Sequence, residues 1–165
     1  MKFGFHEESS ILAEKTQSAG IANSLTGDTL ADIVEKNMMD LNDLLPKDKG
    51  DLLPAYRLED CTYSEIEPII PQLMEWLQDM NWPVSRIIAD NLLRFQDKLE
   101  NEILFVLNTN DGMWKYWVIS IFGNATKSKL IQERIIQIAT NPTIDEINCD
   151  VSIEAREIID SSKWS

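Results

Sequence analysis

The chain has 165 residues, a length that suits one domain with a sizeable core and is too short for two comfortable ones. Its 28 acidic side chains outnumber its 15 basic ones and give a formal net charge of −13 at pH 7. This charge disfavours nucleic acid and acidic membrane surfaces as direct partners, because both are bound mainly through Lys and Arg. It permits a basic protein partner, and it also fits a surface that is simply kept soluble.

Signals for export, membrane insertion and disulfide pairing are weak. Residues 1–8 become acidic before any apolar stretch forms, unlike a signal peptide, and no run approaches the roughly 18 apolar residues that span a bilayer. Cys61 and Cys149 are far apart and lack a metal-binding spacing. We therefore expect a cytoplasmic protein with two unpaired thiols, a single long-range disulfide being the alternative.

Helical periodicity begins at about residue 29. Apolar residues from Leu30 to Leu45 recur at steps of three and four, with Asp28 or Thr29 as a cap and Pro46 as a stop. This pattern predicts a helix over about 29–45, within an N-terminal extension of residues 1–43. A charged loop over 46–51 and a short helix over 52–58 follow.

Apolar stripes at helical spacing become clear in the second half of the chain. They predict helices over about 66–80, 84–95, 98–107, 113–122, 130–138 and 147–159. Pro68 and Pro71 should delay or kink the first of them, and the last could break near Cys149-Asp150. Capping boxes are predicted at three pairs: Ser64 with Glu67, Asp97 with Glu100, and Thr143 with Glu146.

Two tryptophans stand at matching places in these helices. Trp82 and Trp114 each follow a polar, turn-forming stretch and precede an apolar helical run. Such self-similarity is typical of stacked helix pairs, and no segment alternates as a strand would. We predict an all-α, HEAT-like α-α superhelix of antiparallel helix pairs over residues 44–165, with a plain helical bundle as the alternative.

Several short runs resemble a known family. They are LLPKDK (44–49), EPIIP (67–71), EWLQDMNWPV (75–84), WKYW (114–117) and ATNPT (139–143). Through these runs, the segment of about residues 44–160 resembles the bacterial family called domain of unknown function 5071. The resemblance implies a cytoplasmic, HEAT-like helical fold. It implies no activity and no catalytic residue, and it does not cover residues 1–43.

Motifs for catalysis are missing. His6 is the only histidine, and no phosphate-binding loop or nucleophile elbow occurs. The densest carboxylates are Asp145 and Glu146 with Asp150, and a second group of Glu59, Asp60, Glu65 and Glu67. Neither group has the spacing of a calcium loop, so both are interpreted as solvated helix ends. We expect no enzymatic activity, no cofactor and no metal.

The candidate binding residues surround the tryptophans. Trp76, Trp114 and Trp117 fall on apolar stripes and are expected in the core. Trp82 either wedges two repeats together or is exposed, and helical geometry directs Lys115 and Tyr116 to the surface. Asn91, on an apolar stripe, is expected to hydrogen-bond a neighbouring helix end or to line a groove. The partner-binding candidates are Asp79, Asn81, Trp82, Lys115 and Tyr116.

The sequence thus favours a non-catalytic protein-binding module that acts through the concave surface of a helical repeat. One alternative is an immunity protein that neutralises a basic toxin. Another is a carboxylate-dependent enzyme on a helical-repeat scaffold, such as one that acts on DNA lesions. The net charge of −13 argues against a DNA-binding groove, for which the loosely clustered basic residues are Lys47, Lys49, Lys115, Lys127 and Lys129.

Overall fold

The computed structural model describes residues 40–162 and residue 164. Residues 1–39 of the predicted extension (residues 1–43), and with them most of the helix predicted over about 29–45, lie outside the described residues. The described part of that helix is a 3-10 turn, η1 (Leu41–Leu44). Asp40 begins the turn, and its carboxylate accepts a hydrogen bond from the backbone amide of Asn42 at 2.9 Å.

The described residues form helices and short 3-10 turns, with no strand, so the all-α prediction is confirmed for them. Each described helix is too short or too polar to cross a lipid bilayer. The helices are α2 (Leu52–Arg57), α3 (Tyr63–Ile66), α4 (Ile70–Glu75), α5 (Pro83–Leu93), α6 (Glu100–Leu107), α7 (Gly112–Phe122), α8 (Lys129–Thr140), α9 (Ile144–Asn148) and α10 (Val151–Ser161). The further 3-10 turns are η2 (Leu58–Asp60), η3 (Glu67–Ile69), η4 (Trp76–Gln78) and η5 (Gln96–Lys98).

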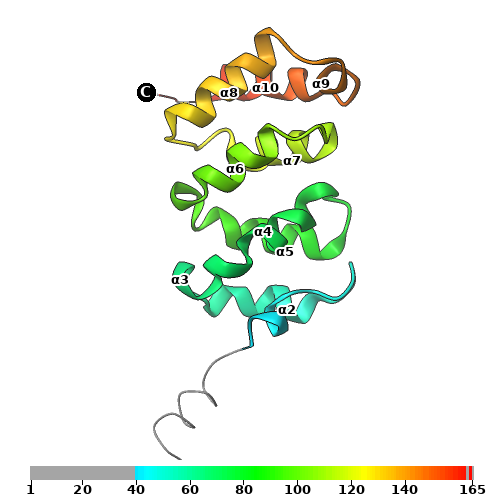
Figure 1. Cartoon of the computed structure of the whole chain (residues 1–165), viewed down its shortest axis with the longest axis vertical. Helices are drawn as coiled ribbons and strands as arrows, with labels where there is room; N and C mark the ends of the chain where they lie inside the picture. Colours follow the sequence, from blue (N-terminus) through cyan, green and yellow to red (C-terminus); the bar gives the residue numbers. More distant parts are fainter. Residues whose placement is uncertain (1–39, 163, 165) are drawn as a thin grey trace, which may run out of the picture. The chain divides into compact units, whose positions relative to one another are not determined.

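Within the unit that begins at Asp40, the helices follow one another in chain order (Figure 1). α2 lies at one end, α3 to α5 come next, then α6 with α7, and α8 to α10 at the other end. α2 packs on α5, α5 on α7, and α7 on α10, while α4 packs on α6 and α6 on α8. We call the three successive helices α5, α7 and α10 the α5–α7–α10 row, because they carry the candidate site.

Prolines divide the helix predicted over 66–80 into pieces. Pro68 lies in η3 and Pro71 lies at the start of α4, and proline, which lacks an amide donor, fits only the first turn of a helix. Accordingly α3, η3, α4 and η4 replace one continuous helix. The capping box predicted at Ser64 and Glu67 is wrong, because the capping box at the start of α3 is formed by Thr62 and Glu65.

The other capping predictions had mixed outcomes. The box of Thr143 and Glu146 is confirmed at the start of α9. The box of Asp97 and Glu100 is wrong, because α6 begins after Leu99 without a side-chain cap. The predicted break near Cys149-Asp150 is confirmed, and there Asp150 adopts a left-handed φ of 58° between α9 and α10.

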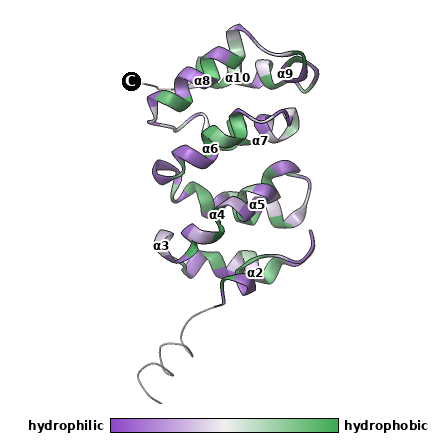
Figure 2. Cartoon of the chain, in the orientation of Figure 1, coloured by the Kyte–Doolittle hydropathy of each residue, from purple (hydrophilic) through white to green (hydrophobic). Residues whose placement is uncertain are grey.

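The core consists mainly of Leu, Ile and Val from every layer. The helices contain both apolar and polar residues, as amphipathic helices do (Figure 2). Trp114 is buried as predicted, at 8% exposure, and its indole Nε1 donates to the Met74 carbonyl at 3.0 Å. Trp76 and Trp117 are only half-buried, so their placement in the core is confirmed only in part. Cys61 and Cys149 are both free thiols, as predicted.

Asn91 connects neighbouring layers as one of its two predicted roles requires. Its side-chain amide donates to the Ala55 carbonyl in α2 at 3.4 Å and to the Ile87 carbonyl at 2.9 Å. Its oxygen accepts from Arg94 Nη1 at 2.9 Å. The same guanidinium donates to backbone carbonyls around η2, among them that of Glu59 at 2.9 Å. A buried amide with these partners stabilises the contact between α2 and α5.

Gly112 allows the start of α7 to approach α9 closely. A Cβ atom at this position would lie 2.7 Å from Cys149 Sγ and 2.8 Å from Asp145 Oδ2. Both distances are shorter than van der Waals contact, so α7 and α9 would have to separate to accept a side chain.

We therefore expect Gly112→Ala to lower the free energy of unfolding by about 1–3 kcal/mol, although alanine favours helix in general. Thermal melting and urea unfolding measure the effect. Gly50→Ala is the matched control, because a Cβ there meets only Asp48 Oδ1 at 3.4 Å. Equal melting temperatures for the two variants would contradict this account of the contact.

Candidate functional site

Lys115 lies in the interior, so its prediction as a surface residue is wrong. The side chain is 3% exposed, and its Nζ donates to Glu146 Oε1 at 2.8 Å. Helical geometry directs Lys115 away from Trp114 and Trp117, but α9 packs against α7 and covers that side. Lys115 is therefore not available to a partner.

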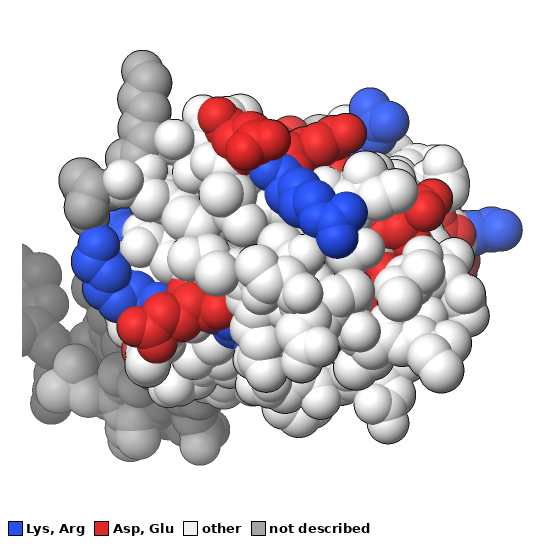
Figure 3. Space-filling view, turned by 90° about the horizontal axis from the view of Figure 1, so that it is seen from above, with Lys and Arg blue, Asp and Glu red and all other residues white. Residues whose placement is uncertain are grey.

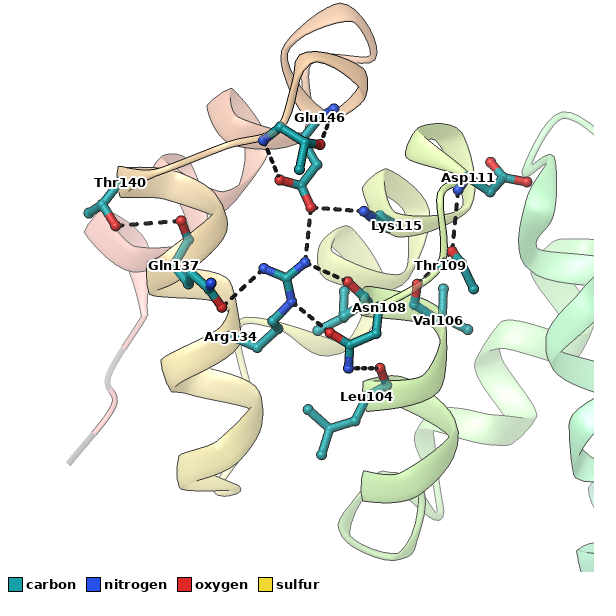
Figure 4. A network of polar contacts seen from close by, with 12 residues as sticks. Leu104, Val106, Asn108, Thr109, Asp111, Lys115, Arg134, Gln137, Thr140 and Glu146 are labelled. Carbon is teal, nitrogen blue, oxygen red and sulfur yellow. Dashed lines mark hydrogen bonds and ion pairs between the residues drawn. The ribbon is translucent and has the colours of Figure 1, made fainter.

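Glu146 is the centre of a network that joins four segments (Figure 4). Its Oε1 also accepts from Arg134 Nη2 of α8 at 3.0 Å, and its Oε2 accepts from the Thr143 backbone amide at 2.9 Å. Arg134 in turn donates to the Leu107 carbonyl at 2.9 Å and to Asn108 Oδ1 at 3.1 Å, at the end of α6. The interpretation of Glu146 as a solvated helix end is wrong, because its side chain is fully buried.

The network keeps Glu146 ionised. Burial raises the pKa of its carboxyl group, but the hydrogen bond from Lys115, the Thr143 amide and the charges of Lys115 and Arg134 outweigh burial and lower the pKa below 4.5. A carboxyl group with a lowered pKa is a poor general acid or base near neutral pH. Among the described residues, His, Cys, Asp and Glu form no group of three that could hold a metal ion. We interpret the network as structural.

Because the pKa of Glu146 is lowered in the folded state, its contribution to stability is present above pH 4.5 and is lost as the pH falls through the folded value. Glu146→Gln should remove this contribution, so the variant should lose less stability than the wild type as the pH falls from about 5. At neutral pH the same change should lower the free energy of unfolding by about 3–5 kcal/mol, since Lys115 remains buried without its partner. Urea unfolding at several pH values measures both effects.

The double variant Lys115→Met with Glu146→Gln is the internal control for the ion pair. It should be more stable than Glu146→Gln alone, because the buried ammonium group is removed as well. Strictly additive losses in the two single variants and the double variant would show that the pair does not act as a unit.

Two hollows open beside Trp117 on the α5–α7–α10 row. The α7–α10 hollow has a volume of about 440 Å³ and is lined on one side by Tyr116 and Trp117. The α5–α7 hollow has a volume of about 460 Å³, and its lining includes Asn81, Arg86 and Trp117. Trp117 thus lies between two concave areas, and it is half-buried there.

Tyr116 and Trp117 form a rigid aromatic corner. Their ring centroids are 5.0 Å apart and the ring planes meet at 87°, an edge-to-face geometry that aromatic pairs favour. Burial raises the pKa of the Tyr116 hydroxyl. The charge of Glu154 and its hydrogen bond to Tyr116 raise that pKa further, as do the charges of Glu157 and Asp150. The corner therefore faces the negative charges of Asp150, Glu154 and Glu157.

The five predicted binding residues do not form one patch. Tyr116 lines the α7–α10 hollow and Asn81 lines the α5–α7 hollow, on either side of Trp117. Asp79 closes the turn before α5, where its Oδ1 accepts from the Asn81 backbone and side-chain amides, each at 2.9 Å. Trp82 is half-buried and packs edge-to-face on Trp76 at 5.7 Å. Lys115, as described above, faces the interior.

Sequence reasoning missed Trp117 as a surface residue, together with Arg86 and Glu154 in the hollows. Trp114 and Trp117 share a helical stripe, and a stripe indicates a common side without showing where the covering neighbour ends. Here Trp114 reaches Met74, whereas Trp117 lies at the edge of the covered area. The run of three aromatic residues within 114–117 was the available signal.

Charged side chains around the α8–α10 end are distributed in separate groups (Figure 3). On this face Asp and Glu form several acidic groups, Lys and Arg lie singly beside them, and a broad uncharged area separates the groups. Of the basic residues considered for a nucleic-acid groove, Lys115 is buried and Lys127 pairs with Asp97 at 2.9 Å. The view shows no continuous basic stripe on this face.

The described residues form an all-α domain. In its second half, Tyr116 and Trp117 of α7 lie beside the acidic residues at the start of α10. The family described as Domain of unknown function (DUF5071) matches residues 44–159, and the chain belongs to it. The resemblance found in the sequence is thereby confirmed over almost the same range. Comparison with curated proteins finds no match.

Substitution of Trp82 tests how much its packing on Trp76 stabilises the turn before α5. Since it is half-buried against Trp76, Trp82→Ala should lower the free energy of unfolding by about 2–3 kcal/mol, somewhat less than the loss of a fully buried tryptophan. Thermal melting measures the loss. A melting temperature within about two degrees of the wild type would instead assign Trp82 to an exposed contact whose loss weakens partner binding.

Proposed function

We propose that this chain is a non-catalytic protein-binding module, built as a HEAT-like stack of helix pairs, and that it binds its partner through the α5–α7–α10 row. The proposed pairs are α4 with α5, which both pack against η4, α6 with α7, and α8 with α10. In stacks of this kind one helix of each pair contributes to an extended binding surface. The α5–α7–α10 row corresponds to that surface.

The distances along the chain between bonded groups support a repeating arrangement. Side chains hydrogen-bond to groups about one helix pair away: Asn91 to Ala55 across 36 residues, and Trp114 to Met74 across 40. Near the end of the chain, Trp164 Nε1 donates to the Gly123 carbonyl across 41 residues at 3.0 Å. Each layer is thus joined to the preceding one by a similar step, as in a helical repeat.

The observation that carries the proposal is the half-buried Trp117 between two hollows, with Tyr116 beside it. Exposed apolar residues continue the surface, with Met113 at 44% and Ile153 at 49% exposure. Trp and Tyr dominate the binding energy of protein interfaces because they bury a large area with few rotatable bonds.

The experiment is affinity capture from the native host with wild type, Trp117→Ala and Leu130→Ala, followed by mass spectrometry. Leu130 is the matched control, since it is a large apolar residue of α8 with 54% exposure and lines neither hollow. We expect Trp117→Ala to remain folded, with a melting temperature lowered by no more than that of Trp82→Ala, and to weaken partner binding by about 2 kcal/mol or more. Leu130→Ala should capture the partner as the wild type does. Equal capture by all three proteins would show that the assigned surface is wrong.

A narrower form of this proposal is an immunity protein with a basic toxin as its partner. The net charge of −13 favours it, because complementary charge speeds the encounter and an acidic surface can cover a basic one. Co-expression with a toxin gene found next to this gene is the test, and it should rescue the cells. Continued killing by that toxin would refute the immunity role and leave the wider proposal in place.

The enzymatic alternative requires a carboxyl group with a raised pKa in a pocket. Glu65 and Glu146 both have a lowered pKa instead, Glu65 through hydrogen bonds from Thr62 and Glu146 through the network described above. These two groups therefore lend no support to acid–base catalysis, and we prefer the binding function.

A further inference from the structure

The α7–α10 hollow combines an aromatic wall with an acidic rim. Tyr116 and Trp117 form the wall. The rim carries Asp150, which precedes α10, and Glu154 and Glu157 on the first turns of α10. The residues that line this hollow include no Lys or Arg, whereas the α5–α7 hollow contains Arg86 beside Asp90. The two hollows therefore differ in charge although they share Trp117.

The acids of the rim have no cationic partner among the described residues. The ion pairs between those residues join Lys115 and Arg134 to Glu146, and Lys127 to Asp97. None of them includes Asp150, Glu154 or Glu157. The raised pKa of Tyr116, to which all three carboxylates contribute after burial, is a second sign that their field converges on the aromatic corner.

This combination matches the chemistry of a guanidinium group. The guanidinium group of arginine is planar, stacks on the face of a Trp or Tyr ring, and donates several hydrogen bonds to carboxylates in a fixed geometry. The apolar side chains of Met113 and Ile153 line the same hollow and suit the methylene stem of a long side chain. Residues 1–39 of the chain contain six acidic residues and three lysines but no arginine, so this segment does not supply the fitting side chain.

We propose that the α7–α10 hollow binds an arginine side chain from a basic segment of a partner protein. The inference rests on the proposed function, and it narrows the binding surface to one pocket and one partner chemistry. Trp117 stacks on the guanidinium, and Tyr116, whose ring is perpendicular to that of Trp117, borders its edge. Glu154, with Asp150 and Glu157 beside it, accepts its hydrogen bonds.

The test is an NMR titration of the full chain with N-acetyl-arginine methylamide. Each tryptophan gives an indole N–H signal, and Trp117→Phe identifies the one that belongs to Trp117. We expect this signal to shift with saturation in the millimolar range, on the order of 1 mM, as suits a single side chain. The citrulline analogue, which has the same shape without the charge, should produce no saturable shift. Equal shifts with both compounds would overturn the proposal, as would a Trp117 signal that does not move.

Two charge variants separate a specific site from general attraction to an acidic protein. Glu154→Gln and Glu133→Gln each remove one negative charge, but Glu133 is exposed on α8 and lines neither hollow. Glu154→Gln should weaken arginine binding by about threefold or more, and Glu133→Gln should leave it within error. Equal weakening by the two variants would show that the probe responds only to net charge, and the pocket would be refuted.

The two proposals fail in distinguishable ways. If the arginine probe does not bind at Trp117 while Trp117→Ala still loses the captured partner, the surface is correct and the arginine pocket is wrong. If the probe binds as expected while Trp117→Ala captures the partner as the wild type does, the pocket exists and the α5–α7–α10 row is not the surface for that partner.

Discussion

The second half of the molecule depends on one buried carboxylate. Glu146 is fully buried, and an ionised group in such a place destabilises the fold unless it is paired and hydrogen-bonded. The chain supplies both cations from different helices, Lys115 from α7 and Arg134 from α8, and the Thr143 amide occupies the second oxygen. The position of α9 over α7 is thus tied to electrostatic satisfaction as well as to apolar contact. Arg134 extends the same constraint to the end of α6.

This constraint also positions the candidate surface. α7 carries Lys115 on its buried side and Tyr116 with Trp117 toward the hollows, so the pairing of Lys115 with Glu146 fixes the rotation of the helix about its axis. The acids of α10 enter the same hollow from the other side. The break at Asp150 turns the chain from α9 into α10, and both helices pack against α7. α7 therefore contributes Lys115 to the buried network with Glu146 and Trp117 to the proposed binding surface.

Local features were predictable from the sequence. The apolar stripes located α5, α7, α8 and α10 closely, and the spacing of Thr143 and Glu146 located the start of α9, because periodicity and capping act within one or two turns. The division between α3 and η4 was less clear, since Pro68 and Pro71 indicate interruption without showing how many turns remain helical. Of the predicted binding residues, the structure places Tyr116 and Asn81 beside hollows, whereas Lys115, predicted at the surface, is buried, and Trp117, predicted in the core, is only half-buried. Both errors concern which neighbour covers a given side of a helix, and that depends on residues 30 or more positions away, such as Glu146 for Lys115.

The links between layers have a consequence for how the molecule opens. Asn91 joins its layer to Ala55, Trp114 joins the next layer to Met74, and Trp164 joins the last to Gly123, so each link crosses only one boundary. No described side chain in this set connects the first layer directly to the last. In such a chain of neighbours, opening at one end removes one boundary and leaves the others intact. Within the unit that begins at Asp40, amide hydrogens should therefore exchange with solvent slowest around α6 and α7, which have a neighbouring layer on both sides.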